Sequence, residues 1–272
     1  MDGLTVYHLI EFLITGSVAG ILAGFFGIGG GIVMIPVLLI IFKKMGISED
    51  VIVQVTFGTC IAASIFTSLL SSITHTKNGN VVWKQVFFMA STGIVGSLVG
   101  STLASHTRGD LLRLLFGWLL VYVSLQLFFR KNGEKNIYEG KHYNVPITNL
   151  FIGFITGLIA SFFGIGGGTI AVPLMTFTVN TPVHRAVGNS SSLIVFLSLF
   201  ATIGYVYNGL GNSSLPGYTI GFIHIIAWFL LTISGAVTAP QGAKLSKKTD
   251  AKKLKKYFSI LLAIIGTKMV LF

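Results

Sequence analysis

Two stretches decide the fold: GILAGFFGIGGGIVMIP at residues 20–36 and GLIASFFGIGGGTIAVP at residues 157–173. Each lies within a longer aligned segment, 16–39 in the first case and 153–176 in the second. Eleven of the 24 aligned positions are identical, including all of FFGIGGG and the proline five residues after it. The chain therefore contains an internal repeat whose most constant part is a run of glycines.

The repeat continues downstream of the glycine runs. Gly58-Thr59-Cys60 corresponds to Gly188-Asn189-Ser190, and Asn78-Gly79 corresponds to Asn208-Gly209. Matching interruptions in the corresponding segments of two duplicated halves are typical of secondary transporters, and they indicate where the binding site lies.

The composition indicates a protein that lies in a lipid bilayer. Hydrophobic residues make up 53% of the chain, charged residues only 10%, and the mean hydropathy is +0.83. Soluble domains carry about 25% charged residues. The net charge of +11 would suggest nucleic acid in a soluble protein. Here the basic residues lie in short connections between apolar runs, so they indicate topology and contact with membrane lipids, and no nucleic-acid partner is expected.

Eight hydrophobic segments follow one another in two sets of four. They are residues 8–42, 51–74, 86–105 and 111–129, then 145–179, 183–207, 218–239 and 257–272. A helix that spans a bilayer needs about 20 apolar residues, and GIGGG interrupts the first segment of each set. We therefore predict an all-α membrane protein with a first transmembrane repeat (1–130), a polar cytoplasmic loop (131–144) and a second transmembrane repeat (145–272).

The charges of the connections predict the orientation. Residues 208–218 carry no charge and should lie outside, whereas 244–256 hold seven lysines and should lie inside. If each broken segment is re-entrant, the repeats are inverted, with about 14 basic residues inside and about 4 outside. If each crosses the membrane, the repeats are parallel and the counts are about 12 and 6. The counts favour inversion, as do the pieces 32–42 and 169–179, which at about 16 Å would cross only half a bilayer.

The glycine runs are the predicted substrate site. Each glycine costs a helix about 1 kcal/mol relative to alanine, so three in succession predict a break. The break creates a helix N-terminus whose free N–H groups and positive dipole end suit an anion without any charged side chain. The predicted backbone site comprises Gly29, Gly30, Gly31, Gly166, Gly167, Gly168 and Thr169. Spaced glycines instead favour close helix packing, as at Gly16, Gly20, Gly24, Gly93, Gly96 and Gly100.

A second polar cluster follows each break. Thr59, Asn189 and Ser190 are candidates for donating hydrogen bonds to an oxyanion, with helix–helix hydrogen bonding as the alternative. Arg185 is either an anion clamp or a cytoplasmic anchor. The single cysteine, Cys60, fits a small core residue, and His224 fits either a core histidine or a proton relay.

Enzyme functions lack their required patterns. No strand precedes the glycine runs, and no G-x-x-x-x-G-K-[ST] occurs, so neither a dinucleotide nor a phosphate loop is indicated. The sequence shows no paired carboxylates within the apolar segments, and its histidines have no metal-ligand spacing. We predict that the protein is not an enzyme and needs neither a cofactor nor a metal ion.

The repeated pattern G-x-x-x-G-x-x-x-[GA]-x-x-G-[IV]-G-G-G-x-x-x-x-P resembles the TauE/SafE permeases. So do R-A-V-G-N-S at 185–190, close to that family's A-x-G-T-S, and the later Asn-Gly before a helix. The resemblance covers essentially the whole chain and implies transport of small sulfur-containing anions such as sulfite or sulfonates. Two sites depart from the family pattern: Asn189 replaces the usual threonine, and residues 56–60 match it loosely.

Together these features predict a multi-pass transporter of the cytoplasmic (inner) membrane that works by alternating access. The substrate would be a small sulfur-containing anion, coupled to a proton or a sodium ion, and the protein could form a homodimer. The alternative is an anion channel, or a transporter of another small anion such as a carboxylate.

Overall fold

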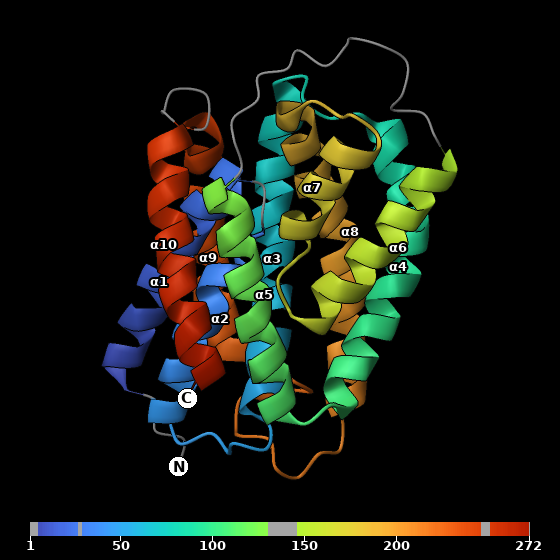
Figure 1. Cartoon of the computed structure of the whole chain (residues 1–272). Coiled ribbons are helices and arrows are strands. Elements are labelled where there is room, and N and C mark those ends of the chain that lie inside the picture. Colours follow the sequence, from blue (N-terminus) through green and yellow to red (C-terminus); the bar gives the residue numbers. More distant parts are fainter. Residues whose placement is uncertain (1–4, 27–28, 130–145, 246–250, 272) are drawn as a thin grey trace.

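The computed structural model describes residues 5–26, 29–129, 146–245 and 251–271, and within these ranges the chain forms ten helices and a β-hairpin (Figure 1). The first repeat contributes α1 (Val6–Phe26), α2 (Gly31–Lys44), α3 (Ile52–Lys77), α4 (Trp83–His106) and α5 (Gly109–Phe129). The second contributes α6 (Pro146–Phe162), α7 (Gly168–Thr178), α8 (Val183–Gly209), the antiparallel hairpin β1 (Thr219–Ile220) and β2 (Ile223–His224), α9 (Ile225–Leu245) and α10 (Ala251–Leu271). The predicted loop at 131–144 lies outside the described residues.

Six of these helices are long and apolar enough to cross a membrane, namely α1, α3, α4, α5, α8 and α9. Three shorter apolar stretches accompany them: α6, α7 and residues 262–271 at the end of α10. The prediction of a helical, multi-pass membrane protein is confirmed. The count of eight hydrophobic segments stays a prediction, because the segments 145–179 and 257–272 are not among these six spans.

The outer surface is apolar and the interior holds many polar side chains. Ile147 is 80% exposed and Val237 is 64% exposed, while Gln85 and Asn189 are fully buried. A soluble protein seldom exposes so many large apolar side chains or buries so many polar ones. A lipid environment accounts for both, since polar groups there must find partners inside the protein.

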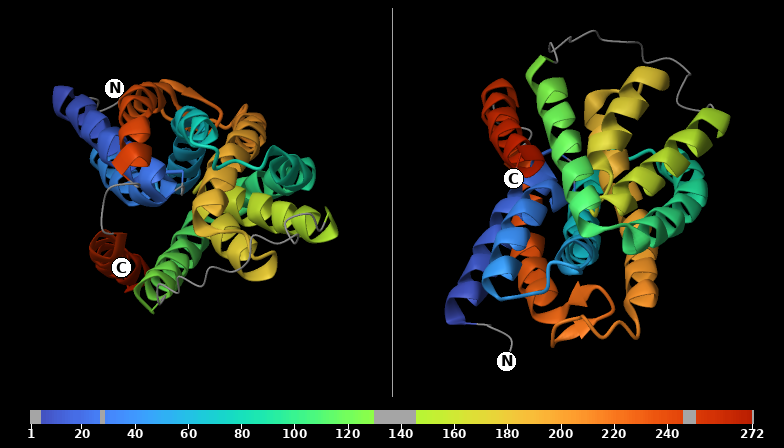
Figure 2. Two further views of the ribbon diagram at one scale, coloured as in Figure 1. Left: turned by 90° about the horizontal axis from the view of Figure 1, so that it is seen from above. Right: turned by 60° about the horizontal axis from the view of Figure 1, so that its bottom comes forward.

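The two repeats interlock rather than pack as separate bundles. α3 and α8 lie side by side at the centre, α1 packs against α9, and α6 packs against α4 (Figures 1 and 2). α5 and α10 form a further pair. The first helix of each repeat therefore packs against the fourth helix of the other, so the contacts of one repeat reappear in the other.

Small residues allow these helix pairs to approach closely. A Cβ on Gly20 would lie 2.4 Å from the Gly235 carbonyl oxygen, and one on Gly157 would lie 2.1 Å from the Gly93 carbonyl oxygen. These two contacts occupy equivalent positions in the α1–α9 and α6–α4 pairs. The predicted packing role is confirmed for all six spaced glycines, because an added Cβ would meet the backbone or a side chain of a neighbouring helix at Gly16, Gly20, Gly24, Gly93, Gly96 and Gly100.

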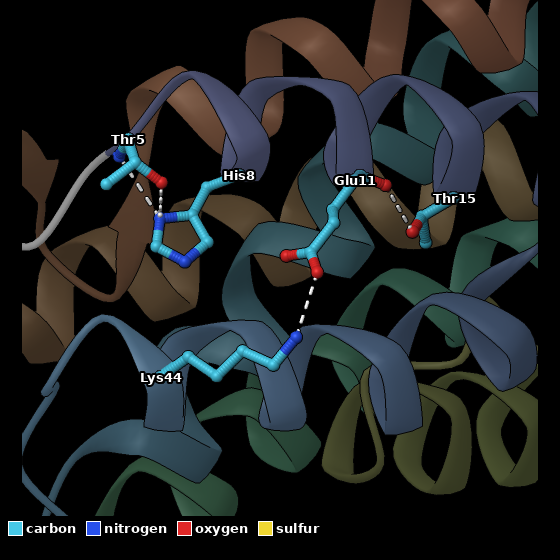
Figure 3. A network of polar contacts seen from close by, with 5 residues as sticks. All are labelled: Thr5, His8, Glu11, Thr15 and Lys44. Atoms are coloured by element: carbon cyan, nitrogen blue, oxygen red, sulfur yellow. Dashed lines mark hydrogen bonds and ion pairs between the residues drawn. The ribbon is translucent and has the colours of Figure 1, made fainter.

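Each broken segment reverses direction at its break. The Nζ of Lys44, at the end of α2, lies 2.9 Å from Glu11 Oε1 near the start of α1 (Figure 3). In the second repeat, Gln85 Nε2 donates to Asn149 Oδ1 near the start of α6 and to Thr181 Oγ1 just after α7, both at 3.2 Å. The α1–α2 and α6–α7 pairs are therefore helical hairpins that open toward opposite ends of the molecule (Figure 1).

The two ends of the molecule differ in charge. The end at which α3 and α9 finish and α8 begins, here termed the basic end, carries Lys77, Lys84, Arg185 and Lys244 and is uppermost in Figure 1. The opposite end, termed the hairpin end, carries the β-hairpin and the end of α2. There, Lys44 pairs with Glu11 as above, and Lys43 pairs with Glu49.

Candidate functional site

Both glycine stretches leave the helical conformation. The backbone takes left-handed φ angles at two successive glycines, +78° and +77° at Gly29 and Gly30, and +80° and +100° at Gly166 and Gly167. Such angles strain any residue with a side chain. α2 and α7 each begin at the next residue, so the predicted helix starts are confirmed. Gly27 and Ile28 of the first stretch fall outside the described residues.

The two glycine stretches touch each other at the centre of the molecule. A Cβ on Gly29 would lie 3.5 Å from the Gly166 Cα. A Cβ on Gly31 would lie 2.8 Å from both the Gly164 carbonyl oxygen and the Ile165 Cα. A side chain at Gly31 would therefore force the two backbones apart. The duplication thus places two opened backbone segments in direct contact.

The two central helices flank this contact with residues at equivalent repeat positions. Ser64 of α3 donates a hydrogen bond to the Gly29 carbonyl oxygen at 2.8 Å. Ile194 holds the equivalent position in α8, and its Cγ2 lies 3.2 Å from where a Gly166 Cβ would be. Sequence reasoning missed both residues, because a serine and an isoleucine at matching repeat positions share no chemistry. Their common position in the repeat was the one available signal.

Among the described residues, no side chain caps either new helix start. α2 follows Gly30 and α7 follows Gly167 without a side-chain cap hydrogen bond. The first intrahelical hydrogen bonds come from the third and fourth residues of each helix, and both donate to the N-cap carbonyl of that helix, Gly30 in α2 and Gly167 in α7. The N–H groups at the first two positions of each helix therefore make no intrahelical bond and carry the positive dipole end. Such an arrangement suits an anion.

Thr59 and Asn189 have other partners. Thr59 Oγ1 accepts the backbone N–H of His224 at 3.0 Å, and Asn189 Oδ1 accepts that of Val82 at 2.7 Å. His224 and Val82 directly precede α9 and α4. Each polar side chain therefore supplies an acceptor at the start of a helix of the other repeat, as a capping residue does. This geometry matches the alternative of helix–helix hydrogen bonding.

The remaining predicted residues are spread along the molecule. Thr59 and Asn189 each precede their flanking residue, Ser64 or Ile194, by five positions, or about 7.5 Å of helix. Arg185 is exposed in the first turn of α8, about 13 Å from Ile194 along the axis. That place suits an anchor at the membrane surface. Ser190 and Cys60 are fully buried in the central helices, and Thr169 lies in the first turn of α7.

Comparison with known proteins agrees with the resemblance seen in the motifs. The profile of the family described as sulfite exporter TauE/SafE matches residues 12–269. The chain belongs to the sulfite exporter TauE/SafE family. It is 27% identical to a probable membrane transporter protein of Haemophilus influenzae, over 95% of this chain and 97% of the relative. It is 29% identical to one of Methanocaldococcus jannaschii, over 95% of this chain and 94% of the relative.

Family membership makes this TauE/SafE protein a membrane transporter rather than a member of an enzyme class. A third relative, the probable membrane transporter protein YunE of Bacillus subtilis, is 26% identical over 96% of this chain and 97% of its own length. No solved structure matches the chain significantly. The structure also explains how Asn189 can replace the usual threonine, since either residue supplies an oxygen that accepts the Val82 N–H.

Proposed function

We propose that this TauE/SafE protein is a secondary transporter that moves small sulfur-containing anions, such as sulfite or sulfonates, across the cytoplasmic membrane by alternating access. One observation carries the proposal: two opened glycine backbones, each leading into an uncapped helix start, touch at the centre of the molecule. Half-helices with their N-termini near the membrane midplane are how secondary transporters bind anionic groups.

The chemistry of the helix starts suits an oxyanion. Backbone N–H groups donate hydrogen bonds and carry a fixed partial positive charge, which an oxyanion can accept at several oxygens. None of the nearest atoms found around the touching glycines, in the ranges that the structure describes, belongs to a lysine or an arginine. Neutral donors bind an anion less tightly than a charged side chain in an ion pair does, so the anion can be released to either side.

The proposed membrane topology follows from the two helical hairpins. The Lys44–Glu11 contact, and the contacts of Gln85 with both Asn149 and Thr181, place the end of each broken segment near its beginning, which supports two re-entrant segments. Because the hairpins open toward opposite ends, the repeats would be inverted. Inverted repeats around a central site give alternating access by rocking of one part against the other.

The proposed orientation places the basic end in the cytoplasm. That end carries Lys77, Lys84, Arg185 and Lys244, together with the backbone positions of four further lysines in the first two turns of α10. At the hairpin end, Lys43 and Lys44 are paired with Glu49 and Glu11. Cytoplasmic faces carry the excess of Lys and Arg, so residues 210–218 would face outward.

Flux measurements on the purified protein in liposomes test this function. Radiolabelled sulfite uptake should saturate with concentration and should accelerate when unlabelled sulfite is loaded inside, because a carrier exchanges its substrate. Taurine-type sulfonates should compete, and acetate should compete weakly. Uptake that rises linearly with sulfite concentration, with no exchange, would identify a channel instead. Competition by acetate but not by sulfonates would indicate that the substrate is a carboxylate rather than a sulfur-containing anion.

A further inference from the structure

The two helix starts have the same backbone but different side chains around them. Thr156 of α6 and Ala19 of α1 hold equivalent repeat positions, and each lies against the N-cap glycine of its repeat. Thr169, the second residue of α7, corresponds to Ile32, the second residue of α2. The start of α7 thus has two threonine hydroxyls at positions where the start of α2 has an alanine and an isoleucine.

The Thr156 hydroxyl is buried without a partner. The residue is fully buried, and its Oγ1 makes no hydrogen bond in the part of the chain that the structure describes. Its Cγ2 lies 3.0 Å from where a Cβ on Gly167 would be, so the side chain contacts the N-cap of α7. Buried helical threonines usually donate to the carbonyl four residues earlier, as Thr15 and Thr56 do here.

Two more buried hydroxyls without a partner belong to α7 itself and to the central helix α8. Thr169 Oγ1 is buried and has no hydrogen-bond partner among the described residues. Ser198 of α8 is fully buried, and its Oγ is also unpartnered in those ranges. It lies one helical turn beyond Ile194 and next to Leu197, whose Cδ1 is 3.5 Å from the position of a Gly167 Cβ. An unpartnered buried hydroxyl destabilises a protein, which suggests that these groups are kept for a ligand.

The asymmetry extends over the whole described structure. Every buried hydroxyl that lacks a hydrogen-bond partner in residues 5–26, 29–129, 146–245 and 251–271 belongs to the second repeat. They are Thr156, Ser161, Thr169, Ser198, Thr202 and Thr232. In the first repeat, two buried hydroxyl residues of α3, Ser64 and Thr67, both donate to main-chain carbonyls.

From this asymmetry we infer that a single anion binds at the start of α7 rather than midway between the two helix starts. The Thr156 and Thr169 hydroxyls and the N–H groups of the first turn of α7 donate to it, and Ser198 lies at its margin. The start of α2 forms the opposite wall and binds no ligand. The inference rests on the proposed function and specifies the site: a small oxyanion with at least three oxygens, held by neutral donors from one repeat.

The double variant Thr156→Val, Thr169→Val tests this site, because valine keeps the shape of threonine and removes the hydroxyl. Sulfite uptake into liposomes should need at least about a hundredfold more sulfite for half-saturation, since each hydrogen bond to a charged ligand contributes about tenfold or more. The thermal unfolding temperature of the ligand-free protein should not fall, because no hydrogen bond within the protein is lost. A purely structural pair of threonines could not give this combination.

Thr67→Val is the matched control, a buried threonine of α3 whose hydroxyl is bonded within its own helix. It should change the sulfite concentration for half-saturation by less than about twofold, because the ligand makes no hydrogen bond to this hydroxyl. If wild-type protein transports sulfite and the double variant does so with unchanged half-saturation, the α7 site is wrong and the transport function stands. A double variant that unfolds at a clearly lower temperature would also overturn the inference. If the wild type moves no sulfite, both proposals fail together.

Discussion

At the scale of the residue, glycine has two separate roles in this chain. Gly20 and Gly157 have ordinary helical backbones and let neighbouring helices touch. Gly30 and Gly167 instead take left-handed φ angles that end one helix and begin the next. Spacing alone distinguishes the two roles in the sequence, because packing glycines recur at helical intervals whereas conformational glycines stand in succession. This distinction could be predicted because it depends on local backbone geometry alone.

Replacing Gly30 and Gly167 together with leucine should abolish transport. Each leucine would occupy a left-handed position, which costs about 1–2 kcal/mol, and its side chain would fill the space at a helix start. A Cβ on Gly30 would already lie 3.1 Å from the Ala19 carbonyl oxygen. Gly46→Leu is the control, because Gly46 has φ +78° and nothing within 4 Å. It carries the same backbone cost away from the site and should transport normally; equal loss in both variants would mean that backbone strain alone explains the effect.

The polar residues after each break were predicted only in part. Thr59 and Asn189 occur where the sequence places polar side chains near the start of a central helix, and both are indeed buried. Their hydroxyl and amide groups can serve a ligand or a neighbouring helix equally well. The sequence could not decide between these roles, because the donors that these side chains accept from, His224 and Val82, lie in the other repeat, 165 and 107 residues away. A substrate contact by either residue stays a prediction.

At the scale of the element, different kinds of contact hold the helices together at the two ends of the molecule. At the basic end, Asn189 donates to Gln85 Oε1 at 2.7 Å, and Gln85 in turn donates to Asn149 and Thr181. At the hairpin end, the positions equivalent to Asn149 and Gln85 are Phe12 and Ala227. There the rings of Phe12 and Phe42 lie 6.4 and 5.3 Å from that of His224. One end is thus held by hydrogen bonds between α4, α6 and α8, and the other by aromatic packing.

The polar cluster makes a prediction about stability. Asn189→Leu would leave the Val82 N–H and Gln85 Oε1 without their partners and should lower the free energy of unfolding by about 1–3 kcal/mol. Asn189→Thr would keep an acceptor for Val82, as Thr59 does for His224, and should cost less than about 1 kcal/mol. Thermal or denaturant unfolding in detergent micelles measures both. Equal losses in the two variants would show that the Val82 hydrogen bond contributes nothing.

At the scale of the whole molecule, the sequence predicts the parts better than their assembly. Two repeats, two breaks and the helices around them follow from periodicity, glycine content and charge. The packing of α1 against α9 and of α6 against α4 did not follow from these. Which helices pair depends on how surfaces far apart in the chain fit together, for example Gly16 against Leu231. A single sequence without homologues carries no direct signal for such pairs.

The proposed inverted arrangement of the repeats predicts that equivalent connections face opposite sides of the membrane. Glu49 and His184 lie where the third helix of each repeat begins, and both are exposed. In intact cells, a membrane-impermeant maleimide should label Glu49→Cys and leave His184→Cys unlabelled, because the basic end would face the cytoplasm. The native Cys60 is fully buried and should give little background. After the cells are permeabilised, both cysteines should react, which shows that each is accessible. If the repeats were parallel, both connections would lie on the same side of the membrane, and both positions would show the same labelling in intact cells. That result would show that the inverted topology is wrong.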